Sequence, residues 1–260
     1  MIRKMKNYFR VFVGPRKNGF LIYTMGKVGS STLSKQFKGS YHFHTLESRS
    51  VKRYGTAGIV SSILKFFMHR ILQVIRVKRV RKFIQRSDQL WILSGFRNPV
   101  RRNISAYFQH LNRRSRNLDK PAYLVREFFS CYPQGTHIEW FDIELKEYLG
   151  INIYDYPFDY KKGYIVIREG KINLLLYRTE NLDSVIEYLS SITNSLGKTI
   201  DNYNVYTDKW YSDIYMKFSE KIDFSHEYIN YIYDNDVTRY FYTEDQINDM
   251  KKEYVGERKS

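Results

Sequence analysis

The segment TMGKVGSST at residues 24–32 combines glycine, lysine and hydroxyl side chains in the manner of a phosphate-binding loop. Gly26 and Gly29 allow the backbone to turn and to approach a ligand closely. Lys27 supplies a cation, and the free N–H groups at the start of a following helix favour an anion. The residues expected to contact a phosphorylated ligand are Lys27, Val28, Gly29, Ser30, Ser31 and Thr32. The alternative is an ordinary strand–turn–helix corner that is rich in small residues.

The spacing within this segment differs from two common nucleotide-binding motifs. A triphosphate-binding loop has four residues between its first glycine and Gly-Lys-Ser/Thr, and a dinucleotide fingerprint reads Gly-x-Gly-x-x-Gly. Here Lys27 precedes Gly29, so neither pattern is present. The segment is also short for wrapping a triphosphate, which argues against a kinase-type nucleotide site.

A second strand–loop–helix corner contains the sequence FRNPVRRNISAYF. Residues 90–93 are predicted to form a buried strand that turns at Ser94–Gly95, and Pro99 is well placed to begin a helix because its missing N–H is not needed there. Arg97 lies at the strand exit, and Ser105 follows eight residues later. A guanidinium group suits a dianionic phosphate, so we expect Arg97 and Ser105 to bind one phosphate together.

The elements around these corners alternate between strands and helices, which predicts an α/β fold. We expect a P-loop-like parallel sheet flanked by helices and a single domain over residues 1–260. Its core is predicted at about 20–218, with a basic helical insertion at about 58–86 and a Tyr-rich C-terminal tail at 219–260. Ligands of such sheets bind outside the carboxyl ends of the strands, so both corners should open onto one edge. The remaining predicted elements are helices at 31–37, 121–132, 138–150 and 183–192, and adjacent strands at 164–170 and 171–178.

Net charge is +16 and is distributed unevenly along the chain. Residues 1–118 contain 26 Lys or Arg and two acidic residues, whereas residues 119–260 contain 17 Lys or Arg and 25 acidic residues. A split of this size indicates an anionic partner on one face: a nucleotide, an acidic polymer, nucleic acid or a membrane surface. A solvated basic face without a specific partner is the alternative.

Composition also bears on the compartment and on metals. Cys131 is the single cysteine, which excludes an intrachain disulfide and a cysteine-rich metal site, and we expect no metal. No segment has the roughly 18 uninterrupted apolar residues of a membrane span. We therefore expect a cytoplasmic protein. The basic amphipathic stretch 58–86 adds peripheral contact with an anionic inner-membrane surface as an option, beside a helix that merely covers the sheet.

Taken together, the two corners resemble those of the sulfotransferases that use 3′-phosphoadenosine 5′-phosphosulfate (PAPS). The 24–32 segment is similar to their 5′-phosphosulfate loop, and residues 96–108 are similar to their 3′-phosphate motif, including its Arg-to-Ser spacing. Further along, TDKWYSDIY at 207–215 resembles the Asn-Lys-Trp-Tyr-Ser signature of a bacterial capsular polysaccharide synthesis group, with Asp208 in place of the asparagine. The resemblance covers roughly residues 20–215.

This resemblance implies an enzyme that moves a sulfuryl group from PAPS to a hydroxyl of a glycan, a capsular polysaccharide precursor or a lipid-linked glycan. Lys27 would hold the 5′-phosphosulfate with the rest of its loop and stabilise the leaving phosphate. Lys209 or Tyr211 would close over the nucleotide. Glu180 matches a glutamate that follows a late strand in such enzymes, but we expect it to form an ion pair with Arg178 or to cap a helix.

The resemblance also places a general base after the second strand, where this chain reads YHFHTLES. An acceptor hydroxyl must lose a proton to a base whose pKa is near neutral. His44 is the first candidate and Glu47 the second. Because side chains alternate along a strand, His42 and His44 should share a face, and one of them is then structural.

Two other functions remain open from the sequence. A nucleic-acid-binding protein would use the basic region at 49–116, but it would leave both phosphate corners unexplained and no nucleic-acid-binding motif is present, so we expect no nucleic acid. A nucleotide-dependent kinase lacks the required glycine–lysine spacing.

Overall fold

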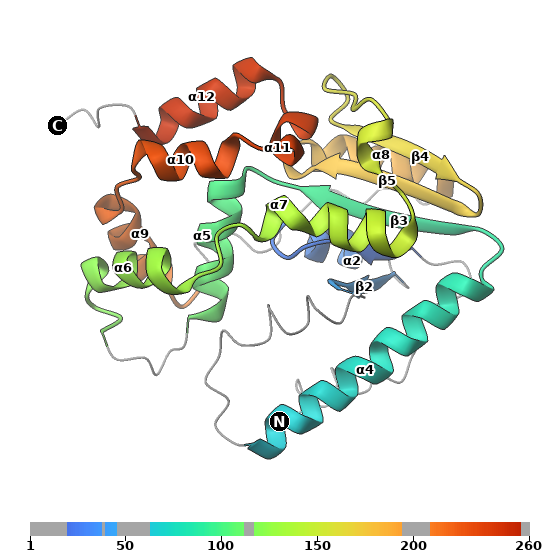
Figure 1. Ribbon diagram of the computed structural model, residues 1–260, viewed down its shortest axis with the longest axis horizontal. Coiled ribbons are helices and arrows are strands. Elements are labelled where there is room, and N and C mark those ends of the chain that lie inside the picture. The colour runs from blue at the N-terminus through green and yellow to red at the C-terminus, as the bar shows by residue number, and fades with distance from the viewer. Residues whose placement is uncertain (1–19, 38–39, 46–62, 112–116, 194–208, 256–260) are drawn as a thin grey trace.

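The computed structural model describes residues 20–37, 40–45, 63–111, 117–193 and 209–255 (Figure 1). These residues form a mixed α/β structure in which helices cover both faces of one sheet. Chain order gives the elements β1 (Leu21–Tyr23), α2 (Ser30–Gln36), β2 (Tyr41–Phe43), α4 (Ile63–Arg86), β3 (Leu90–Phe96), α5 (Pro99–His110), α6 (Pro121–Cys131), α7 (Thr136–Phe141), the π-helix η1 (Asp142–Glu147), the 3₁₀ turn η2 (Ile153–Asp155), β4 (Tyr164–Glu169), β5 (Ile172–Arg178), the 3₁₀ turn η3 (Thr179–Asn181), α8 (Leu182–Thr193), α9 (Ser212–Lys221), α10 (His226–Tyr233), α11 (Asp236–Phe241) and α12 (Glu244–Val255).

The sheet has five strands in the order β2-β1-β3-β5-β4. Strands β2, β1, β3 and β5 are parallel, and β4 pairs antiparallel with β5 at the edge. The predicted α/β class, the mostly parallel sheet and the adjacent late strands are therefore confirmed. Because the parallel strands share a direction, the exits of β1 and β3 lie side by side at one edge, as expected for the two corners.

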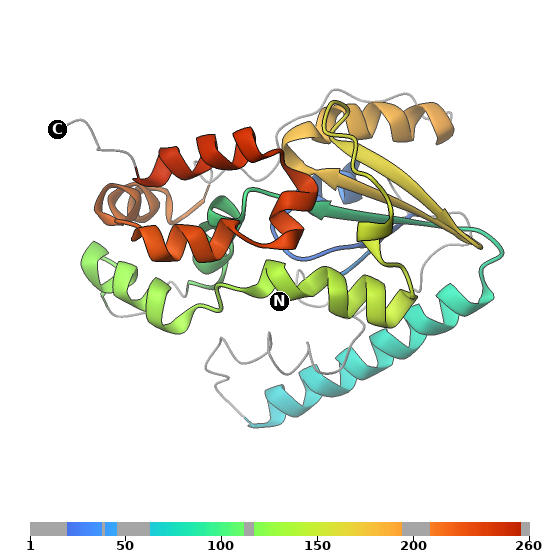
Figure 2. The same cartoon turned by 45° about the horizontal axis from the view of Figure 1, so that its top comes forward.

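Each face of the sheet has its own apolar cluster. Alternate residues of β1, β3 and β5 pack against α2 and α8 on one face. The other face carries the larger cluster, which includes α7, η1 and the C-terminal helices. Figure 2 shows the sheet between α8 on one side and the α7–η1 segment on the other. Two buried faces explain why β3 and β5 read as nearly continuous apolar runs.

The third strand is longer than the sequence predicted. β3 continues through Ser94 and Gly95 to Phe96, so the expected turn at Ser94–Gly95 was wrong. Gly95 is needed inside the strand because the Tyr177 ring of β5 packs against it: a Cβ there would lie 2.4 Å from the Tyr177 Cζ. Glycine in this strand marks a close side-chain approach instead of a turn.

The predicted basic helix is confirmed over Ile63–Arg86, while residues 58–62 lie outside the described part of the chain. Near its C-terminal end, Val80 and Ile84 are buried in the core, and Lys78 and Lys82 are exposed. The C-terminal end of the helix thus packs against the core and has a basic outer side, while the rest of α4 extends away from the sheet (Figures 1 and 2). Among the described helices, none is both long enough and apolar enough to cross a membrane.

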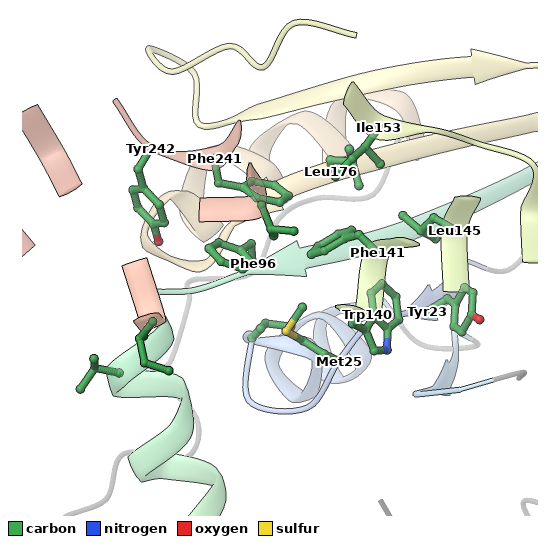
Figure 3. Close-up of a cluster of buried hydrophobic side chains, with 14 of the residues drawn as sticks. Tyr23, Met25, Phe96, Trp140, Phe141, Leu145, Ile153, Leu176, Phe241 and Tyr242 are labelled. Carbon is green, nitrogen blue, oxygen red and sulfur yellow. The ribbon is translucent and has the colours of Figure 1, made fainter. Parts of the chain in front are cut away.

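The Tyr-rich segment that begins at residue 219 is part of the core. Helices α10, α11 and α12 bury Ile229, Tyr233 and Phe241, among other side chains. The Phe241 ring stacks on Phe96 at the end of β3, with ring centroids 4.7 Å apart (Figure 3). The predicted core boundary at about 218 is therefore too early, because aromatic residues from this segment belong to the larger apolar cluster.

Candidate anion-binding site

The loop that joins β1 to α2 has an unusual backbone. Both Lys27 (φ 74°) and Gly29 (φ 76°) are in the left-handed region, and Gly29 is the N-cap of α2. Glycine tolerates this conformation, and a Cβ at Gly29 would also lie 3.0 Å from a Leu182 methyl group. For lysine the same conformation costs roughly 1–3 kcal/mol, and such strain is typical of ligand-binding sites.

Side chains from three other elements hold this loop in place. Arg102 Nε of α5 donates to the Gly26 carbonyl at 3.3 Å, and Arg97 Nη1 donates to the Lys27 carbonyl at 3.4 Å. The Tyr177 hydroxyl donates to the Val28 carbonyl at 2.9 Å. Because three successive carbonyls are held, the loop has one defined shape before any ligand binds.

The cations of the two predicted corners lie close enough together to affect one another's charge. Burial, and after it the neighbouring charges of Arg97, Lys209 and Arg102, together lower the pKa of Lys27 from 10.5 to about 8. The pKa of His110 is also lowered, by burial and then by Arg102 and Lys27. Within the described residues, neither Lys27, Arg97 nor Arg102 forms an ion pair with a carboxylate. A cluster of mutually repelling cations without such a carboxylate is suited to bind an anion.

The Arg-Asn-Pro corner has its own support. The Asn98 side chain caps α5 by accepting from the Arg101 N–H at 3.1 Å. The Glu180 carboxylate accepts from the Asn98 N–H at 3.1 Å and from the Tyr242 hydroxyl at 2.9 Å. The Tyr233 hydroxyl donates to the Asn98 side chain at 2.9 Å. Helix α10 and the residue after α11 therefore help to fix the start of α5.

These contacts decide between the readings of Glu180. Its carboxylate accepts from the N–H of Asn98, the N-cap residue of α5. Glu180 therefore helps to cap α5, a helix far from it in the sequence. The Arg178 guanidinium instead donates to Asn181, Gln246 and the Tyr160 carbonyl. The expected ion pair between Arg178 and Glu180 does not form in the described structure.

The hydroxyl residues of the two corners differ in their surroundings. Ser30 is buried, Thr32 is half-buried and Ser31 is exposed at the start of α2. Ser105 is half-buried on α5, three residues after Arg102 and thus on the same side of the helix. No described residue offers the Ser105 hydroxyl a hydrogen bond, and it forms none with Arg97. Helix α2 has only seven residues, so the charge of the site comes from the side-chain cations around the loop and not from the helix terminus.

Two other expected contributors are placed differently. Val28 is fully buried, backbone included, and its carbonyl accepts from the Tyr177 hydroxyl, so it shapes the loop from within the core. Lys209 lies close enough to Lys27 to lower its pKa, which puts it beside the loop. Tyr211 is buried against Phe108, with ring centroids 5.5 Å apart. It therefore anchors the Lys209 segment to the core and does not point toward a bound nucleotide.

His44 follows β2 at the same sheet edge. Its Nδ1 lies 2.7 Å from the Thr24 carbonyl, and since a carbonyl only accepts, Nδ1 carries the hydrogen. In the neutral ring Nε2 is then the basic nitrogen. The His42 ring lies 4.4 Å from that of His44, which confirms that the two share a face. Glu47, the second candidate base, lies outside the described residues.

Thr24 connects these features. Its N–H donates to the Phe43 carbonyl at 3.2 Å, and its hydroxyl contacts the N–H and the carbonyl of Gly95 at 2.9 and 3.1 Å. The exits of β2, β1 and β3 are thus tied together where His44, the Lys27 loop and Arg97 begin.

Arg102 is the contributor that the sequence prediction missed. It is 6% exposed, and its Nη1 also donates to the Asn103 side chain at 3.0 Å and to the Tyr132 hydroxyl at 3.2 Å. One signal was available: an arginine in a helix whose neighbours Val100, Ile104 and Tyr107 are apolar must either be ion-paired or serve a site. The described residues contain no group of three His, Cys, Asp or Glu that could hold a metal ion.

Comparison with known proteins gives one match. No curated protein and no solved structure shows significant similarity to this chain. One family model matches residues 115–243, a region that contains α6 to α11. It includes the Lys209 segment and the residues that support the Arg-Asn-Pro corner. Over residues 115–243 the chain is similar to the NKWYS family, described as "Putative capsular polysaccharide synthesis protein".

Proposed function

We propose that this protein is a PAPS-dependent sulfotransferase that acts on a hydroxyl of a glycan in capsular polysaccharide synthesis. The observation that supports this best is the meeting of two anion corners, because Arg97, Arg102 and Lys209 all lie close enough to Lys27 to lower its pKa. The family match supports a role in making capsular polysaccharide, and hence a biosynthetic transferase.

The residues fit a nucleotide that carries phosphates at two separate positions. Lys27 and the following backbone and hydroxyl groups would hold the 5′-phosphosulfate. Arg97 and Ser105 would hold the 3′-phosphate, with Arg102 adding a buried charge between the corners. Bound PAPS supplies an activated sulfuryl group. Fixed cations at the point where charge accumulates on the leaving phosphate oxygen lower the barrier to its transfer.

Within this proposal His44 is the general base. Its Nδ1–H is directed to the Thr24 carbonyl, so Nε2 is the nitrogen that accepts the proton of the acceptor hydroxyl. The acceptor is a glycan or lipid-linked glycan, and the exposed basic side of α4 provides a surface for an anionic membrane at which a lipid-linked acceptor resides. We place the enzyme in the cytoplasm, peripheral to the inner membrane, and assign it no metal.

Calorimetric titration with adenosine 3′,5′-bisphosphate tests the proposal, with 5′-AMP and ATP as comparison ligands. We expect micromolar affinity for the bisphosphate and much weaker binding of 5′-AMP. Arg97→Ala should weaken bisphosphate binding about ten- to a hundredfold, because a charge-assisted hydrogen bond contributes about 1.5–3 kcal/mol.

Arg101→Ala is the matched control on the same corner. Arg101 is exposed on α5 and pairs with Glu253 at 2.7 Å, so its loss should leave the affinity unchanged. Preference for ATP would replace the proposal with a kinase-type function. Absence of nucleotide binding would refute it and leave a nucleic-acid or membrane role for the basic region.

A further inference from the structure

The strand exit that carries His44 is held by one helical segment from far along the chain. Trp140 Nε1 of α7 donates to the His44 carbonyl at 3.0 Å. One turn later, the Glu144 carboxylate of η1 accepts hydrogen bonds from the hydroxyls of Thr45 and Tyr23. Consecutive residues of the β2 exit, His44 and Thr45, are therefore each bonded to the α7–η1 segment.

These groups are buried. Trp140 is 2% exposed, Glu144 is 1% exposed and Tyr23 is fully buried. The Tyr23 and Trp140 rings pack edge to face, with centroids 5.4 Å apart, and Figure 3 shows them side by side. A buried carboxylate is costly unless it is hydrogen-bonded, and here the Thr45 and Tyr23 hydroxyls each bond to one of the two Glu144 oxygens.

The backbone around Glu144 is also unusual. Glu144 lies in a π-helix, a distortion that is often found at functional sites. Trp140 at the end of α7 bonds to the His44 carbonyl, and Glu144 in η1 bonds to the Thr45 side chain, so both contact the same strand exit. The His44 ring itself is bonded to the Thr24 carbonyl, two residues before Gly26 of the anion-binding loop.

We propose that Trp140 and Glu144 are positioning residues that set the direction and tautomer of the His44 ring relative to the anion-binding loop. This inference rests on the role proposed for His44. Trp140 fixes the backbone of His44, and Glu144 fixes Thr45 and the end of β1 at Tyr23. With the backbone fixed on both sides, Nδ1 reaches the Thr24 carbonyl and Nε2 is presented as the basic nitrogen. Neither Trp140 nor Glu144 needs to touch a substrate.

The experiment uses ¹⁵N NMR of the histidine rings in the full-length protein, with His44→Ala identifying the His44 signals. Wild type should show His44 mainly protonated on Nδ1. Trp140→Phe removes the indole N–H and keeps an aromatic ring, and it should shift His44 toward a mixture of tautomers. Thr45→Val should do the same because it removes a hydroxyl without changing the shape, whereas Thr45→Ser, which keeps the hydroxyl, should restore the wild-type pattern.

Two controls separate positioning from general damage. Trp91→Phe removes an indole N–H on β3, where Trp91 packs against Phe20 and Tyr188 on the other face, and it should leave the His44 signals unchanged. Calorimetry with adenosine 3′,5′-bisphosphate should give affinities for Trp140→Phe and Thr45→Val within about twofold of wild type, because the cation cluster is untouched.

Turnover provides the second readout. With water in place of the glycan hydroxyl, PAPS is hydrolysed to sulfate and adenosine 3′,5′-bisphosphate, and the water proton passes to His44. The rate of this hydrolysis should fall about tenfold or more in Trp140→Phe and Thr45→Val and recover in Thr45→Ser, with little change in the KM for PAPS. Unaltered His44 signals in both variants would overturn the inference while leaving bisphosphate binding intact. Failure of the proposed function is distinct from this, because it would appear as a wild-type protein that does not bind the bisphosphate.

Discussion

Ligand affinity should depend on pH through Lys27. In the free protein its pKa is about 8, because burial and the charges of Arg97, Lys209 and Arg102 disfavour the ammonium form. A phosphate group bound beside Lys27 supplies the missing negative charge and returns the pKa toward its ordinary value of 10.5. The bound state therefore retains a proton that the free protein loses above pH 8.

The magnitude follows from the protonated fraction. At pH 7 about ten-elevenths of Lys27 is protonated in the free protein, and at pH 9 about one-eleventh. Affinity for adenosine 3′,5′-bisphosphate should thus fall about tenfold between pH 7 and pH 9. The ligand contributes little to this change, since the second pKa of its phosphates is near 6. Stability of the free protein should change in the opposite direction and rise from about pH 8 to 10.5, because the unfolded chain keeps the Lys27 proton longer.

Calorimetry at several pH values, in buffers with different ionisation enthalpies, measures both the affinity and the proton taken up. At pH 9 binding should take up close to one proton. Lys27→Arg is the matched variant: it keeps a charge that does not titrate in this range, and its affinity should be nearly independent of pH. An affinity that stays constant from pH 7 to 9 in wild type, or an equally steep decline in Lys27→Arg, would refute the reasoning.

Two further substitutions test how the loop and the Arg-Asn-Pro corner are held. Tyr177→Phe leaves the Val28 carbonyl without its donor and should cost about 1–3 kcal/mol in urea unfolding, together with weaker bisphosphate binding; unchanged affinity would show that this contact does not shape the loop. Tyr242→Phe removes one of the two hydrogen bonds described for Glu180 and should lower stability by a similar amount and weaken the bisphosphate; a loss of stability alone would limit Tyr242 to packing.

The strands were predicted correctly where a local run of apolar residues was enough to identify them. Residues 90–93 and 172–178 form strands because their apolar runs suit a sheet buried on both faces. The turn at Ser94–Gly95 was wrong because glycine has two meanings that local sequence does not separate. Here the Tyr177 ring, more than 80 residues away along the chain, occupies the space of the missing side chain.

The sequence identified two residues of the candidate site and missed a third, and the ligand that it predicts stays a prediction. Lys27 and Arg97 were found because short motifs around them have a direct physical meaning. Arg102 was missed because its role depends on reaching the Gly26 carbonyl from the next helix. Tyr211 was misplaced because its aromatic ring is equally suited to cover a ligand or to pack in the core, where it lies against Phe108.

By itself, the sequence determined the class of fold and the two strand exits, since these depend on local periodicity and glycine placement, and from the charge around them it predicts a phosphorylated ligand. Only the tertiary structure decided how the cations repel one another around Lys27 and which distant groups hold the corners. Trp140, Glu144, Glu180 and Tyr242 contact residues about 60 to 120 positions away along the chain. Such contacts arise when the sheet and its covering helices pack together, so no local pattern in the sequence records them.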